Sequence, residues 1–172
     1  AINDVAPSTL VYASPNVFTA GVSIGSLLPS VTGTVISYSV SPALPNGLSF
    51  DTMTGEITGT PNGIFASGIY TVTAFNSGGT TTFNIEITVN DVAPSALSYS
   101  SPNVFIIGTP ITSLIPSVAG NVIGFSVSPA LPAGLSIDST TGAITGTPSG
   151  VISSGFYTVT AVNSGGSTTF DI

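Results

Sequence analysis

The sequence contains no lysine, arginine, histidine, cysteine or tryptophan among its 172 residues. Its only charged side chains are seven carboxylates, which give a formal net charge of −7. Because no side chain is cationic, the protein cannot form side-chain salt bridges, and its stability must come from apolar burial and β-ladders. The same absence argues against binding to nucleic acid, which needs Lys or Arg to neutralise phosphates, and against binding to anionic lipid head groups.

The missing cysteine and histidine exclude most catalytic chemistry. Without cysteine there are no disulfides, no reactive thiolates and no cysteine-type zinc or iron–sulfur sites. Without His or Lys, nothing can activate a Ser or Thr nucleophile. Asp51 and Glu56 could form a glycosidase-like carboxylate pair, but Glu56 is replaced by Ala143 in the sequence repeat described below. We therefore interpret Asp51 and Asp138 as turn caps. We expect no enzyme, no catalytic residue, no cofactor and no metal.

Long apolar runs and surface charge are also scarce. The longest run of large apolar residues covers only residues 104–107, far short of a membrane span. The sequence does not begin with an export signal, and we expect any such signal to lie outside this segment or to have been removed. Only 4% of the residues are charged, so the surface must consist of hydroxyl, amide and apolar groups. Two interpretations follow: a stalk kept soluble by hydroxyl groups, or a module whose surface is buried against neighbouring chains in a fibre.

What the sequence does contain is one unit written twice. Residue i matches residue i+87 without a gap, and 57 of the 85 available pairs are identical. The stretch SPALPNGLSFDTMTGEITGTP at 41–61 returns as SPALPAGLSIDSTTGAITGTP at 128–148. Identity this high indicates duplication of a whole domain. We predict repeat 1 at residues 1–89, of which 1–4 are the tail of a preceding repeat and a linker, and repeat 2 at residues 90–172.

The second copy is expected to lack the end of its last strand. Its final residue, Ile172, corresponds to Ile85, which lies in the middle of the last strand expected in the first copy. The sequence thus resembles an excerpt from a longer array. The alternative is a subunit whose last strand is completed by another chain.

Each unit shows short strands bounded by Gly, Pro or Asn. We expect a central strand at 35–41, with Ile36, Tyr38 and Val40 facing inward, followed by a turn at 51–55. Strands are also expected at 68–76, where Tyr70 could form a tyrosine corner, and at 80–89. No helical periodicity of useful length occurs. The predicted fold class is all-β, with two tandem Ig-like β-sandwich domains of about seven strands each.

The pattern LPxGLSxDxxTGxIxGTP, followed by GIYTVTAFNSGG and TTTFNIEITV, resembles the bacterial putative-Ig (He-PIG) family of Ig-like and cadherin-like repeats. Both units match it. The resemblance implies an extracellular setting and a role as spacer in large secreted or surface-anchored bacterial proteins, including adhesins. It carries over no catalytic residue.

We therefore predict structural tandem repeats of a bacterial extracellular or cell-surface protein, acting as a stalk or filament building block. The expected partners are neighbouring repeats of the same chain, with possible homopolymer or fibre contacts, and neither nucleic acid nor a membrane span. The alternative is an adhesin-type binding module for glycan or protein ligands. The stretches that differ most between the copies, 19–20 against 106–107 and 64–66 against 151–153, are not polar enough to favour it.

Two groups of residues could carry a ligand. Tyr12, Tyr38 and Tyr99 could form a sugar-stacking platform, although we interpret them as core or interface residues. Asp4 and Asp91 lie at the module junctions, where calcium binds in cadherin-like proteins. Each junction offers a single carboxylate, whereas calcium takes six to eight oxygen ligands. We therefore interpret these residues as Asx turns, with calcium as the alternative.

Overall fold

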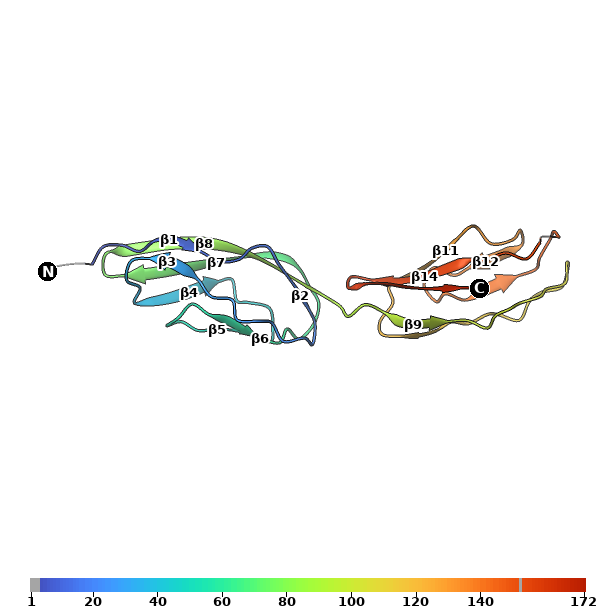
Figure 1. Ribbon diagram of the computed structural model, residues 1–172, viewed down its shortest axis with the longest axis horizontal. Helices are drawn as coiled ribbons and strands as arrows, with labels where there is room; N and C mark the ends of the chain where they lie inside the picture. Colours follow the sequence, from blue (N-terminus) through green and yellow to red (C-terminus); the bar gives the residue numbers. More distant parts are fainter. Residues whose placement is uncertain (1–3, 152) are drawn as a thin grey trace. The chain divides into compact units, whose positions relative to one another are not determined.

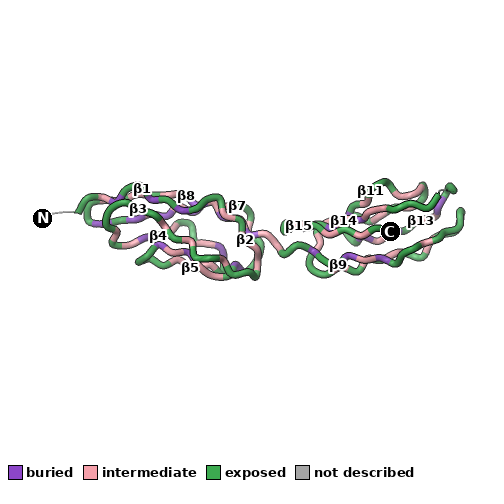
Figure 2. Tube along the Cα trace, viewed as in Figure 1, coloured by how far each residue is buried: buried purple, intermediate pink, exposed green. Residues whose placement is uncertain are grey.

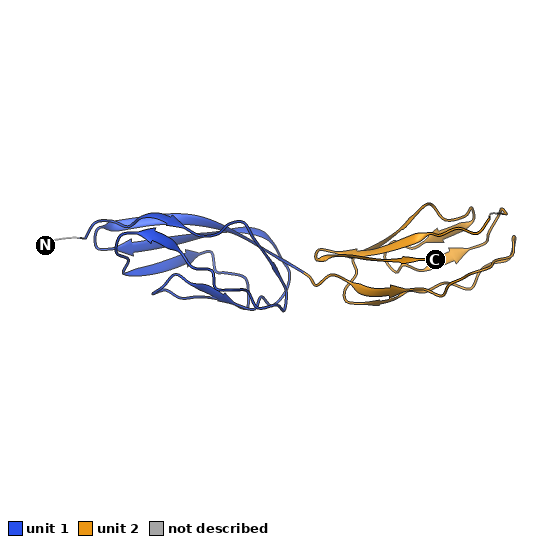
Figure 3. Cartoon of the chain, viewed as in Figure 1, with its two compact units in different colours: residues 1–90 blue, residues 91–172 orange. Residues whose placement is uncertain are grey.

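The computed structural model describes residues 4–151 and 153–172. The chain divides into two compact units, residues 1–90 and 91–172 (Figure 3). All regular elements of the described residues are β-strands, fifteen in total, and none is an α-helix. The all-β prediction is therefore confirmed. Of residues 1–4, expected to be the tail of a preceding repeat and a linker, only Asp4 lies in the described part of the chain.

Unit 1 contains eight strands (Figure 1). They are β1 (Ser8–Val11), β2 (Asn16–Thr19), β3 (Ser30–Thr32), β4 (Ser37–Ser41), β5 (Leu48–Phe50), β6 (Ile57–Gly59), β7 (Phe65–Asn76) and β8 (Gly79–Asn90). The main sheet has the order β2-β8-β7-β4, and β1-β3 and β5-β6 form two short pairs. A bridge between Leu27 and Ile57 joins the chain before β3 to β6.

The long β7–β8 hairpin forms the centre of the main sheet. The two antiparallel strands are in register from Gly68↔Ile87 to Asn76↔Gly79, and a turn at Ser77 and Gly78 joins them. On the inward face of β8, Ile85, Ile87 and Val89 are fully buried. This alternation is the one that the period-2 pattern at residues 80–89 predicts.

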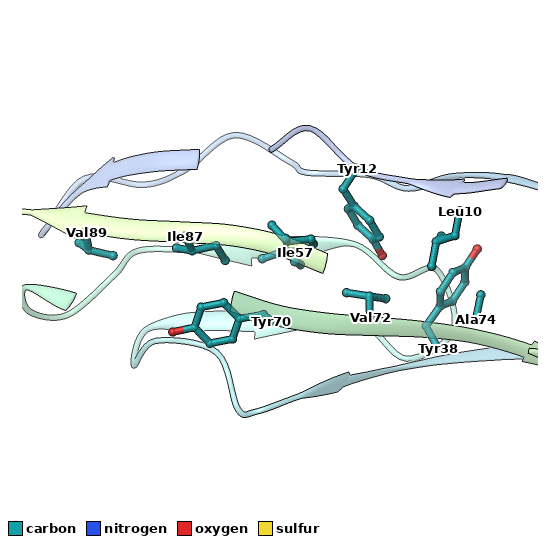
Figure 4. Close-up of a cluster of buried hydrophobic side chains, with 10 residues drawn as sticks. Leu10, Tyr12, Tyr38, Ile57, Tyr70, Val72, Ala74, Ile87 and Val89 are labelled. Atoms are coloured by element: carbon teal, nitrogen blue, oxygen red, sulfur yellow. The ribbon is translucent and has the colours of Figure 1, made fainter. Parts of the chain in front are cut away.

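The core of unit 1 lies between the main sheet and the shorter strands (Figure 4). In the figure, Ile87 of β8 lies next to Ile57 of β6, and Ala74 of β7 lies on the same side of the core as Leu10 of β1. Buried and exposed positions alternate along the strands of both units (Figure 2). Each unit has its own hydrophobic cluster, as expected for independent domains.

The strand expected at 35–41 differs from the prediction in two respects. It begins at Ser37, and it pairs only with β7 at the edge of the main sheet, so it is not central. Tyr38 faces the core as predicted, but Ile36 precedes the strand and is 57% exposed. The backbone N–H of Ile36 still donates to Phe75, 2.8 Å away, which holds the approach to the strand against β7.

The glycine-rich stretch at 41–61 brings two backbones into close contact. The N–H of Thr60 donates to the carbonyl of Gly47 at 2.9 Å. Gly47 has a φ of 91°, and a Cβ on it would lie 2.0 Å from the carbonyl oxygen of Thr60. Gly59 has a φ of 125° and would place a Cβ 2.2 Å from Gly47. Only glycine fits at these two positions.

Unit 2 contains seven strands: β9 (Ser95–Ser98), β10 (Ser117–Ala119), β11 (Gly124–Ser128), β12 (Leu135–Ile137), β13 (Ile144–Gly146), β14 (Thr158–Asn163) and β15 (Gly166–Asp171). Its main sheet has only three strands, in the order β11-β14-β15. Among the residues described in unit 2, none forms a strand equivalent to β2. The β14–β15 hairpin is half as long as β7–β8, six residues per strand against twelve.

Candidate functional site

The turn after β5 confirms the interpretation of Asp51 as a cap. Oδ1 of Asp51 accepts the backbone N–H groups of Met53 and Thr54, at 2.7 and 3.0 Å. These two hydrogen bonds stabilise the carboxylate and lower the pKa of Asp51 below its usual value. Asp138 caps the same turn in unit 2 through Thr140 and Thr141, which also lower its pKa.

Glu56 and Asp51 do not act as a carboxylate pair. The Glu56 carboxylate accepts a hydrogen bond from the Ser26 hydroxyl, whereas that of Asp51 accepts amides of its own turn. The backbones of the two residues pair across the turn, from Asp51 N–H to Glu56 carbonyl at 2.9 Å. Both side chains therefore serve local structure.

The tyrosines proposed for sugar stacking are core residues. Tyr12, Tyr38 and Tyr99 are only 4%, 6% and 7% exposed, so no platform exists on the surface. The hydroxyl of Tyr12 donates to the carbonyl of Gly55 at 2.7 Å, and that of Tyr99 donates to Gly142 at 2.7 Å. Burial raises the pKa of Tyr12, and it raises the pKa of Tyr99 to about 12.

The tyrosine corner predicted at Tyr70 is not found. Tyr70 is buried in the core, but among the hydrogen bonds of the described residues its hydroxyl makes none. The tyrosine whose hydroxyl bonds a distant backbone segment is Tyr12, which donates to the carbonyl of Gly55, 43 residues later in the sequence. It lies just after β1, in the N-terminal part of the unit, where the strand pattern alone gave no reason to expect it.

The carboxylates at the module junctions are engaged within their own units. Oδ1 of Asp4 accepts the N–H of Val5 at 2.9 Å, and Oδ2 accepts the Thr34 hydroxyl. In unit 2, Oδ1 of Asp91 accepts the N–H of Val92 at 2.8 Å. Its Oδ2 accepts a hydrogen bond from Nδ2 of Asn121, which stands at the position of Thr34, at 3.0 Å. In the part of the chain that the structure describes, no three acidic residues gather into a possible metal site.

Two buried asparagines form a structural clamp that the sequence analysis missed. The Nδ2 of Asn76 donates to the carbonyls of Val5 and Thr34, at 2.6 and 2.9 Å, and its Oδ1 accepts the N–H of Gly78 at 2.8 Å. Asn163 repeats all three bonds in unit 2. The recurring Asn-Ser-Gly-Gly sequence is the signal that could have revealed the clamp, which ties the start of each unit to its central hairpin.

Unit 2 contains an apolar groove of about 720 Å³. Its lining includes Phe105, Ile107, Leu131, Leu135, Val151 and Phe156. Ile107 and Val151 belong to the stretches that differ most between the two copies. Most of the residues that line the groove are apolar, and Tyr157 is the titratable side chain among them.

Comparison with known proteins identifies the repeated unit. The family described as "Putative Ig domain" matches residues 6–90 and again 91–172. Two solved structures with matching folds are the N-terminal four Ig domains of Dscam1 isoform 9.44 and a three-Ig fragment of titin. The Dscam1 match has a TM-score of 0.54 at 15% identity and covers 99% of this chain and 45% of the Dscam1 chain. The titin match has a TM-score of 0.51 at 13% identity and covers 98% of this chain and 64% of the titin chain. The predicted Ig-like fold is confirmed.

Among curated proteins, the chain is similar to the "Serine-rich adhesin for platelets" of Staphylococcus aureus. It is 36% identical over 142 residues to the protein of strain MRSA252, covering 80% of this chain and 10% of the adhesin. The match to strain USA300 has the same identity and covers 6% of that protein. The chain therefore spans a tenth or less of the length of these relatives. No helix in the described residues is long and apolar enough to cross a membrane.

Proposed function

Because the chain belongs to the Putative Ig domain family, we propose that it is a pair of structural repeats from a bacterial extracellular or cell-surface protein. The two units act as building blocks of a stalk or filament and carry no enzymatic activity. Their partners are neighbouring repeats of the same kind, with lateral contacts between chains in a filament. The surface adhesin among the relatives supports the extracellular setting.

The observation that carries this proposal is that the polar side chains form hydrogen bonds within their own unit. Asp51, Asp138 and the buried Asn76 and Asn163 all bond within their own unit, and these bonds recur in both copies. No buried polar side-chain atom of the described residues lacks a hydrogen-bond partner. Such a unit keeps its shape and presents no reactive group, which is what a spacer requires.

Sedimentation velocity on the 172-residue chain tests the proposal and separates its two forms. A stalk segment sediments as a monomer at every concentration. A filament building block forms larger species whose proportion rises with concentration. A monomer–dimer equilibrium that closes at the dimer would contradict both forms, because neither a stalk nor a filament ends there.

An adhesin-type module for glycan or protein ligands is the second candidate, favoured by the name of the staphylococcal relative. Glycan-array retention and platelet binding of the folded chain test it, with the heat-unfolded chain as control. Specific, saturable retention of the folded chain alone would assign a binding function. Equal retention of both forms would leave the structural role as the better account.

A further inference from the structure

Two asparagines of unit 1 stand directly before a glycine, in the pairs Asn46-Gly47 and Asn62-Gly63. At such a pair, the backbone nitrogen of the glycine can attack the side-chain amide carbon of the asparagine and close a succinimide ring, because no Cβ on the glycine obstructs the approach. The reaction requires the nitrogen and the carbon to come into contact, so its rate depends on whether the local backbone can rotate. The structure treats the two pairs differently.

Backbone hydrogen bonds hold the Asn46-Gly47 pair in a tight turn. The N–H of Leu48 donates to the carbonyl of Pro45 at 3.1 Å, and this bond encloses the pair. The carbonyl of Asn46 accepts the N–H of Asn62 at 2.7 Å, and the carbonyl of Gly47 accepts a second N–H from the same segment. The Gly47 nitrogen therefore cannot rotate onto the side-chain carbon of Asn46 unless these bonds break.

The Asn62-Gly63 pair lies exposed in the loop between β6 and β7. Among the hydrogen bonds of the described residues, the backbone N–H of Asn62 makes the only one that this pair forms. A Cβ built on Gly63 would meet nothing closer than the Phe65 ring, at 3.8 Å. The loop thus has the room and the freedom that ring closure needs.

We propose that Asn62 is a site of spontaneous modification, where the side-chain amide is converted to aspartate and isoaspartate. The Gly63 nitrogen gives its proton to solvent base and bonds to Cγ of Asn62, while the Cγ–Nδ2 bond breaks and Nδ2 leaves as ammonia. Water then opens the ring, at Cγ to give aspartate or at the backbone carbonyl carbon to give isoaspartate. One water is consumed, one ammonia is released, and nothing is oxidised or reduced.

The modification changes both the charge and the backbone of unit 1. The product carries one carboxylate more than the seven already present, and the chain has no Lys or Arg that could pair with it. Isoaspartate also adds a methylene to the main chain between Pro61, which is fully buried, and Phe65 at the start of β7. Unit 2 has Ser149 at the position of Asn62, so only unit 1 changes in this way.

Incubation of the intact 172-residue chain at mildly alkaline pH, in water labelled with heavy oxygen, tests the proposal. Chymotrypsin cleaves after Phe50 and separates the two pairs, and mass spectrometry of the peptides measures the label. Label should enter at Asn62 at least about tenfold faster than at Asn46, and the Asn62 peptide should become a substrate for isoaspartyl methyltransferase. No reaction at Asn62, or an equal or faster reaction at Asn46, overturns the proposal.

The unfolded chain and two variants separate the effect of the fold from that of the sequence. In urea the two pairs should react within about twofold of each other, because the turn that protects Asn46 is lost. If their rates still differ as in the folded chain, sequence neighbours cause the difference and the proposal fails. Asn62→Ser and Asn46→Ala introduce the residues that unit 2 has at these positions. Asn62→Ser should abolish methylation, whereas Asn46→Ala should leave the rate at Asn62 within about twofold, and persistent methylation of Asn62→Ser would place the isoaspartate elsewhere and overturn the proposal.

Discussion

Gly47 and Gly59 show how single residues determine this fold through their backbone. Each has a positive φ, and each lies where a Cβ would meet the carbonyl of the facing segment. The sequence repeats both glycines in the second copy, as Gly134 and Gly146, and glycine can take the positive φ that tight turns need. It could not show that the two glycines face each other, since that contact depends on the pairing of β5 with β6.

Gly47→Ala should lower the free energy of unfolding of unit 1 by about 2–4 kcal/mol, because it combines backbone strain with a steric clash. Differential scanning calorimetry of the whole chain can measure the loss. Gly25→Ala is the matched control, since a Cβ there meets nothing within 4 Å, and it should change stability by less than about 0.5 kcal/mol. Equal effects of the two substitutions would contradict the close approach.

Asp51 and Asp138 should make the free energy of unfolding depend on pH in the acidic range. The pKa of each is lower in the folded protein than in the unfolded chain, so their contribution is present above the unfolded value, about 3.9. It is lost as pH falls through the lower folded value. The double variant Asp51→Asn and Asp138→Asn should therefore unfold with a weaker pH dependence below about pH 4. Urea unfolding at a series of pH values measures this, and unchanged acid dependence would rule out the two carboxylates as its source.

Among the elements, β4 shows what a strand pattern can and cannot predict. The alternation at 37–41 correctly placed Tyr38 toward the core. The same pattern gave no information about neighbours in the sheet, so the predicted central strand is in fact an edge strand. The predicted strand also began two residues too early, at 35 instead of Ser37, because the apolar Ile36 fits the alternation but lies before the first ladder pair. Periodicity defines faces, whereas strand order depends on contacts distant in sequence.

The asparagine clamp fastens one element to another and has a measurable stability effect. Asn76→Ala would leave the carbonyls of Val5 and Thr34 and the N–H of Gly78 without their partner, at a cost of about 2–3 kcal/mol. Asn84→Ala is the control on the neighbouring strand, because Asn84 is exposed and bonds only the Thr71 hydroxyl. Its expected cost is below about 1 kcal/mol. Calorimetric unfolding of the two variants should separate them, and similar losses would argue against the clamp.

At the scale of the whole molecule, the sequence predicted the fold class and the family, because both depend on a pattern repeated twice. It also showed that Ile172 corresponds to Ile85 of the first copy. It did not predict the groove, since the loss of regular strand at residues 101–105 concerns a segment identical in the two copies. The same five residues form strand β2 in unit 1 and no strand in unit 2, so their conformation depends on contacts outside the segment.

The absence of cations should be visible in the response to salt. With a net charge of −7 and no ion pairs between side chains to weaken, added sodium chloride can only screen repulsion between carboxylates. The melting temperature should stay constant or rise by a few degrees as salt increases from about 10 to 500 mM, a range over which the screening length shortens severalfold. A clear fall in melting temperature, measured by scanning calorimetry, would show that attractive charge interactions had been overlooked.

The parallel pairing of β2 with β8 has a mechanical consequence. β2 lies near the start of unit 1 and β8 is its last strand, and the two run in the same direction. A force that pulls the ends of the unit apart therefore loads the hydrogen bonds between these strands together, in shear, so that they must rupture collectively. Single-molecule stretching should therefore show unit 1 unfolding in one step, with no earlier extension of β2 away from β8.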